Sequence, residues 1–149
     1  MIVRHPLALA ILLLIAAAPG FVLAGTGSVS TKDAMKVFSA VCEASAPSFA
    51  KAPELAKAAG LKEDGKSFVS PSAPISMFFG KDKSGHHSCG MTFTTRDRQP
   101  QVISRISSLP NLSVSQSGGM ALLYHKNPAI TAVLSGPDKG AWTLFYMGQ

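Results

Sequence analysis

Residues 86–95 read HHSCGMTFTT and carry the clearest strand pattern in the chain. Apolar side chains stand at every second position, at Cys89, Met91 and Phe93, with small or polar residues between them. Because successive side chains of a strand point to opposite faces, the odd-numbered face is expected to be buried, with His87 at its entrance. The stretch therefore predicts a core strand that carries Cys89 toward the interior.

An amphipathic helix is predicted upstream of this strand. Its apolar stripe recurs at helical spacing through Ala34, Val37, Phe38, Val41 and Cys42. Thr31 is expected to cap this helix, Glu43 to face solvent, and Pro47 to end it. The stripe places Cys42 on the side of the helix that faces the core.

The sequence between this helix and the core strand predicts a second helix, a loop and a strand. Pro53 opens a short helical segment that ends at Gly60, and residues 61–73 have no period and are expected to form a loop. Residues 75–80 alternate with period two, and a polar run at 81–85 links them to the core strand. The two strands are therefore predicted to form a hairpin.

The C-terminal part predicts one more helix and up to four strands. Asp97 and Pro100 open the helix, and Pro110 ends it. Turn residues then separate four apolar segments, at 112–116, 120–125, 129–135 and 141–147, which are expected to form a meander. The order αα-ββ-α-ββββ predicts a single α+β domain, with helices packed on a mainly antiparallel sheet of about five or six strands.

Residues 1–24 have the features of a secretory signal peptide. Arg4 precedes an apolar run of about a dozen residues, which is shorter than the roughly 20 needed to span a bilayer. Small residues before Ala24 predict cleavage between Ala24 and Gly25, leaving residues 25–149 as one exported domain. Thr26 stands where a lipoprotein signal requires cysteine, so we expect a periplasmic or secreted protein with no lipid and no membrane association after cleavage.

The charge of the chain gives no indication of a nucleic-acid partner. The formal net charge is +6, and lysines alternate with acidic residues instead of forming a basic block with interleaved aromatics. We interpret this distribution as a solvated, mixed-charge surface.

The two cysteines predict a structural disulfide. Export places the chain in an oxidising compartment, and the helical stripe and the strand parity place Cys42 and Cys89 on facing surfaces of one core. The bond would close a loop of roughly 47 residues, which in the chain-entropy model stabilises the fold by about 4 kcal/mol.

The same region offers a metal site as an alternative. His87, Cys89 and Met91 share one strand face, and Cys42 would add a second thiolate from the helix. Imidazole with soft sulfur ligands suits copper or zinc. The two interpretations exclude one another because they use the same sulfurs. A reactive cysteine with a lowered pKa, assisted by His86 or His87, is a third possibility.

Other candidate chemistry is less specific. Arg96, Arg98 and Arg105 surround the third predicted helix, whose N-terminus would favour a carboxylate or phosphate. The sequence contains no Gly-x-Ser-x-Gly or His-Glu-x-x-His motif, so a small hydrolase has no spacing to support it.

These observations favour a small exported binding or accessory protein without a cofactor. Its partner would be an unidentified protein or small molecule of the cell envelope, and its oligomeric state is open. A periplasmic copper- or zinc-binding protein and a small hydrolase are the alternatives.

Overall fold

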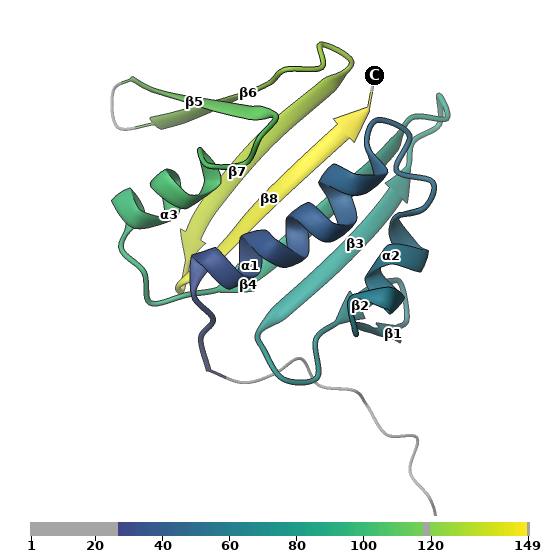
Figure 1. The fold of residues 1–149 in the computed structure, drawn as a ribbon, viewed down its shortest axis with the longest axis horizontal. Helices are drawn as coiled ribbons and strands as arrows, with labels where there is room; N and C mark the ends of the chain where they lie inside the picture. The colour runs from purple at the N-terminus through teal and green to yellow at the C-terminus, as the bar shows by residue number, and fades with distance from the viewer. Residues whose placement is uncertain (1–26, 118–119, 149) are drawn as a thin grey trace, which may run out of the picture.

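The computed structural model describes residues 27–117 and 120–148, and within these ranges helices cover one face of a six-stranded sheet (Figure 1). The helices are α1 Thr31–Phe38, the π-helix η1 Ser39–Glu43, α2 Ala52–Ala58 and α3 Gln99–Ile106. The strands are β1 Lys62–Asp64, β2 Ser67–Val69, β3 Ile75–Lys81, β4 His87–Thr94, β5 Leu112–Ser117, β6 Met120–His125, β7 Ile130–Asp138 and β8 Ala141–Gly148. The predicted α+β class is confirmed.

The large sheet has the strand order β1-β2-β3-β4-β8-β7, and every neighbouring pair is antiparallel. The last strand of the chain thus returns to the middle of the sheet, beside β4. Apolar residues occupy both faces of β8, with Leu144 on one side and Phe145 on the other, and such a strand is suited to a central position. Strands β5 and β6 form a separate two-stranded sheet, so the four predicted C-terminal strands do not form one continuous meander.

The core lies between the helices and the odd-numbered face of β4. Cys89, Met91 and Phe93 are fully buried there, as the strand parity predicted. They stand in register with Tyr146, Leu144 and Trp142 of β8, respectively, which are also buried. Helix α1 crosses this layer, with α3 on one side of it and α2 on the other (Figure 1). The core is therefore one continuous layer.

The first helix differs from its prediction in its cap and in its last turn. Ser30 is the N-cap, because its hydroxyl accepts a hydrogen bond from the backbone N–H of Asp33 at 3.1 Å, whereas Thr31 is the first helical residue and is buried. The α-helix ends at Phe38 and continues as the π-helix η1. Residues within η1 are therefore displaced around the axis from where an α-helical period places them.

Residues 61–73, predicted to be a loop, contain the hairpin of β1 and β2. The strands have three residues each, which is too short for an alternation to be visible in the sequence. Gly65, with φ +61°, lies in the turn between them, where a left-handed backbone favours glycine. The exposed residues of β1 are all charged, which suits a strand at the edge of a sheet.

The predicted signal peptide and its cleavage point after Ala24 lie outside the described residues. Among the helices of residues 27–117 and 120–148, none has the length and apolar character needed to cross a membrane.

Candidate functional site

Two consecutive residues of η1 join the helices to the sheet, and the first of them is Cys42. The structure contains a disulfide between Cys42 and Cys89 of β4, across a sequence separation of 47. The two Cα atoms are 5.6 Å apart, and both residues are fully buried. The bond fixes η1 to the middle of the sheet.

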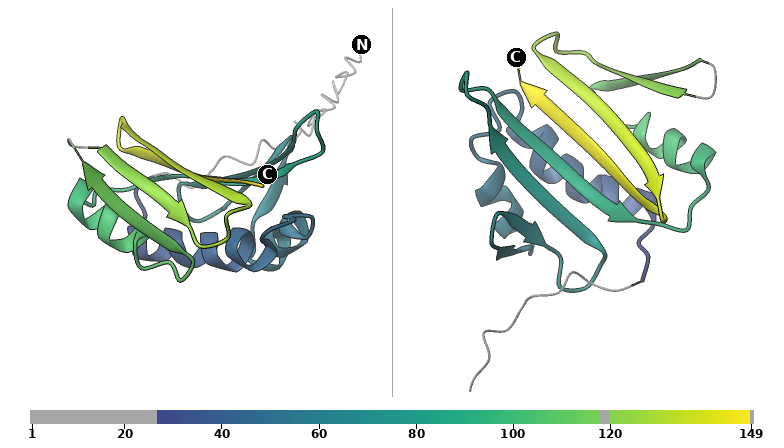
Figure 2. Two further views of the ribbon diagram at one scale, coloured as in Figure 1. Left: turned by 90° about the horizontal axis from the view of Figure 1, so that it is seen from above. Right: turned by 180° about the vertical axis from the view of Figure 1, so that it is seen from behind.

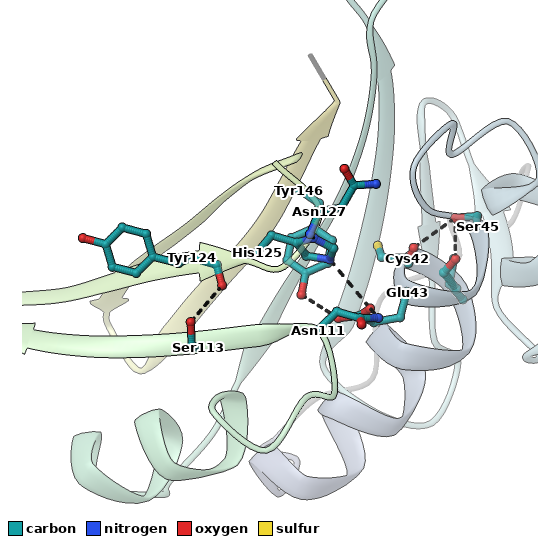
Figure 3. A network of polar contacts seen from close by, with 10 residues as sticks. Cys42, Glu43, Ser45, Asn111, Ser113, Tyr124, His125, Asn127 and Tyr146 are labelled. Atoms are coloured by element: carbon teal, nitrogen blue, oxygen red, sulfur yellow. Dashed lines mark hydrogen bonds and ion pairs between the residues drawn. The ribbon is translucent and has the colours of Figure 1, made fainter. Parts of the chain in front are cut away.

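The side chain of Glu43, the second of these residues, is buried, and the prediction that it faces solvent is wrong. Its side chain is only 5% exposed. The wider i→i+5 turn of η1 places Glu43 between the helix layer and the C-terminal strands (Figure 3). A carboxylate in such a place requires hydrogen-bond donors, because the cost of removing the charge from water is large.

Two side chains supply these donors. The hydroxyl of Tyr146 on β8 donates to Oε1 of Glu43 at 2.7 Å. The amide Nδ2 of Asn111, just before β5, donates to Oε2 at 2.9 Å. Hydrogen bonds to a charged acceptor are among the stronger ones in proteins. Glu43 therefore ties η1 to both β8 and the start of the β5–β6 hairpin (Figure 3).

His125, the last residue of β6, completes this group. Its Nδ1 accepts a hydrogen bond from the backbone N–H of Asn127 at 3.0 Å, so in the neutral ring the proton belongs on Nε2. Nε2 lies 3.9 Å from Oε2 of Glu43, which is beyond hydrogen-bond distance. The His125 side chain is 3% exposed, and Nε2 has no hydrogen-bond partner in the described part of the chain.

Tyr146 stands at the centre of the group. Its ring makes edge-to-face contacts with His125 at 5.0 Å and with Phe38 at 4.8 Å between centroids. Burial raises the pKa of the Tyr146 hydroxyl well above its usual value, and the neighbouring Glu43 raises it further. Tyr146 is thus held as a neutral donor.

We call Glu43, Asn111, His125 and Tyr146 the Glu43 cluster. It contains a carboxylate, a phenol and an imidazole, which are groups used in acid–base chemistry. The side chains of Glu43 and His125 are almost closed to solvent, and His125 also lines a cleft of about 310 Å³ beside Tyr124 and Ile130. The arrangement joins four segments of the chain, namely η1, β8 and the two strand ends at the base of the β5–β6 hairpin.

The residues of the candidate metal site lie in different environments. The sulfurs of Cys42 and Cys89 are bonded to one another, so neither is a free thiolate while the disulfide is intact. Met91 is fully buried in the core. His87 is half-buried and lines a cavity of about 290 Å³ together with Phe49 and other residues. Among the residues that the structure describes, no group of three His, Cys, Asp or Glu side chains is placed to hold a metal ion.

His86, the other histidine of the quoted stretch, lies on the surface. Its Nδ1 is 3.1 Å from Oδ2 of Asp82, and its backbone N–H donates to Oδ1 of the same carboxylate at 2.8 Å. The backbone hydrogen bond is the main reason that the pKa of Asp82 lies below its usual value. His86 thus belongs to the β3–β4 turn and not to the environment of Cys89.

The three arginines of the candidate anion site are not gathered at one point. Arg98 precedes α3 as its N-cap residue, while Arg105 lies in the last turn of that helix. Asp97 does not cap α3. Its carboxylate instead accepts a hydrogen bond from the backbone N–H of Thr31 at 2.8 Å, at the N-terminus of α1. Arg105 and Asp97 line a cleft of about 510 Å³ between α1 and α3. Arg96 is exposed outside this cleft.

Comparison with known proteins supplies no further information on the site. Family models, curated proteins and solved structures were compared with the chain, and none gives a significant match. A function must therefore be argued from the residues and their geometry alone.

Sequence reasoning missed the Glu43 cluster, although one signal pointed to it. Tyr146 stands on the buried parity of the last strand, between Leu144 and Gly148. A buried tyrosine usually brings a hydrogen-bond partner with it. Few acidic residues lie near an apolar stripe, and Glu43 is one of them because it directly follows Cys42, the last residue of the first helical stripe. Glu43 was therefore a candidate partner for Tyr146.

Proposed function

We propose that this protein is exported to the periplasm or secreted, and that it acts there as a disulfide-stabilised binding or accessory protein without a cofactor. The observation that carries the proposal is the buried Cys42–Cys89 disulfide. Disulfides form and persist in oxidising compartments and are rare in the cytosol. The apolar N-terminal segment that precedes the domain supports the same destination.

A binding role is supported by where the polar chemistry lies. Glu43, Asn111 and Tyr146 hydrogen-bond to one another inside the fold, so their geometry fixes which segments lie beside η1. The large sheet, in contrast, has a face that none of the helices within residues 27–117 and 120–148 covers (Figure 2). The molecule thus offers a broad surface to a partner, whether that is a protein or a small molecule of the cell envelope.

The proposal is tested by following the full chain in a bacterial host that exports proteins. We expect the protein in the periplasm or medium, with an intact mass that corresponds to residues 25–149. We also expect no alkylation of Cys42 and Cys89 in denaturant, and two added alkyl groups once a reductant is present. A chain that begins at Gly25 behind a new Met is the control, and it should stay in the cytoplasm with free thiols.

Two results would contradict the proposal. An uncleaved chain in the cytoplasm would remove the exported location. An exported protein with two free thiols would remove the disulfide, and one copper or zinc per chain, lost in a His87→Ala variant, would then favour the metal-binding alternative.

A further inference from the structure

The face of the large sheet opposite the helices is not covered by any other described helix or strand, and its residues form a regular grid. The left view of Figure 2 shows α1, η1, α2 and α3 on one side of the sheet. On the other side, strand register aligns three rows of four residues across β3, β4, β8 and β7. The rows are Ser76-Thr92-Thr143-Ser135, Phe78-Gly90-Phe145-Val133 and Gly80-Ser88-Met147-Thr131. We call these twelve residues the open face.

The middle row of the open face is apolar and tightly built. The rings of Phe78 and Phe145 are stacked, with centroids 5.7 Å apart and an interplanar angle of 19°. Gly90 lies between them in register, and a Cβ at this position would overlap both rings. Gly90 is buried although no helix covers this side, because the two aromatic rings close over it. The row therefore presents a continuous apolar ridge.

Exposed apolar side chains lie at the β7 end of the ridge and in the row beside it. Val133 is 44% exposed and Met147 is 39% exposed, which are high values for large apolar residues in a sheet. The row on one side of the ridge is polar but neutral, and the hydroxyls of Thr92 and Thr143 are hydrogen-bonded to each other at 3.0 Å. The row on the other side consists of Ser88 and its register partners, of which Met147 alone is large and apolar.

The twelve residues of the open face carry no ionisable side chain, in a chain whose formal net charge is +6. The same rows continue across β2 to Lys62 and Asp64 of β1, so charge on this side of the sheet begins only at its β1 edge. The helices on the other side of the sheet are different, since Lys32, Lys36 and Lys57 are exposed there. A charged partner would find no counter-charge among the twelve residues. The face suits a neutral partner whose apolar and hydroxyl groups are arranged in the same way.

We propose that the partner is a second copy of this chain, docked open face to open face as a sandwich of two sheets. A two-fold axis through the ridge would place apolar row on apolar row and the hydroxyl-bearing rows on one another, which is the self-complementarity that such a dimer needs. Two copies of a basic protein repel one another over most of their surface. The neutral open face lets them meet without burying a charge.

The size of the face predicts a weak, reversible dimer. Four strands and five residues along each strand span roughly 19 Å by 17 Å, or about 320 Å² in projection. Stable complexes bury about 800 Å² of accessible surface per partner, and smaller interfaces are typical of transient ones. We therefore expect dissociation in the micromolar range or above.

The test is sedimentation velocity of the purified, oxidised domain over about 1 µM to about 1 mM, the range of a weak dimer. We expect the apparent mass to rise toward twice the monomer, and the dimer to be retained or strengthened as salt screens the net charge. Val133→Lys places two ammonium groups in the interface, so its dissociation constant should rise by at least about tenfold. Leu122→Lys, an exposed apolar position on β6 outside the open face, is the matched control and should leave the dimer intact.

The proposal is overturned if the protein stays monomeric over the whole range, including the case in which the open face binds another molecule instead. It is equally overturned if the dimer survives Val133→Lys. Circular dichroism and the intact disulfide check that this variant is folded, and Met147→Lys, also exposed, replaces it if it is not. Export and disulfide formation do not depend on dimerisation, so this result is independent of the proposed function.

Discussion

Cys42 and Glu43 are neighbours in η1, and they fasten it to the sheet by two different kinds of junction. The first is the disulfide to Cys89 on β4, surrounded by apolar side chains. The second is the Glu43 cluster, in which a carboxylate holds β8 through Tyr146 and the β5–β6 hairpin through Asn111. One junction is covalent and independent of protonation, whereas the other depends on every polar partner being present.

This difference shows where the stability of each junction arises. A disulfide acts mainly by restricting the unfolded chain, so its contribution depends on the length of the closed loop. A buried hydrogen-bonded carboxylate contributes little net stability, but it imposes a large cost when a partner is removed. The disulfide therefore provides free energy, and the Glu43 cluster determines which segments lie beside η1.

Removal of the disulfide is expected to have the largest effect. The double variant Cys42→Ala, Cys89→Ala should lower the free energy of unfolding by about 4 kcal/mol, as the 47-residue separation predicts. Typical domains have only about 5–15 kcal/mol in total, so the variant should be close to unfolding at 37 °C. Urea unfolding of the oxidised protein and the variant measures the difference. A loss below about 1 kcal/mol would show that the polar junction alone holds η1 in place.

Removal of the Tyr146 hydroxyl is expected to have a moderate effect. Tyr146→Phe keeps the ring contacts but leaves Oε1 of Glu43 without its donor, and we expect a loss of about 1–3 kcal/mol in urea unfolding. Tyr124→Phe is the matched control, because Tyr124 is 55% exposed and its variant should stay within about 0.5 kcal/mol of the parent. Equal effects in the two variants would mean that the Glu43 cluster is not needed to place β8 and the hairpin.

The two junctions also differ in how far the sequence predicts them. The disulfide follows from two local patterns, the helical stripe that carries Cys42 and the alternation that carries Cys89. Both cysteines are buried as these patterns predict, although Cys42 lies in η1, where the α-helical period no longer holds. The Glu43 cluster rests on a π-turn that no local period indicates. Its contacts also join Glu43 to Tyr146, 103 positions away, and to Asn111, 68 positions away. Periodicity predicts the face on which a residue lies, but it does not predict which distant side chain it meets.

The strands show the same limit. The hairpin of β5 and β6 is predictable because two apolar segments flank a turn, but its exclusion from the large sheet is not. That outcome depends on β8, which has apolar residues on both faces and takes the place beside β4. The absence of charge from the open face was visible only once strand register had aligned its rows.

The smallest expected effect tests a third, more exposed carboxylate junction, in which Asp97 accepts the backbone N–H of Thr31. This hydrogen bond is the main reason that the pKa of Asp97 lies below its ordinary value of 3.8. A carboxyl group with a lowered pKa in the folded state stabilises the fold above pH 3.8, and this contribution is lost as the pH falls through the lower folded value. Asp97→Asn should therefore cost about 0.3–1 kcal/mol at neutral pH, and the gap from the parent protein should close in acid. Urea midpoints from about pH 7 to about pH 2.5 measure this gap, and Asp138→Asn, at the exposed end of β7, is the control. A gap that stays constant into acid would show that the charge of Asp97 contributes nothing to this junction.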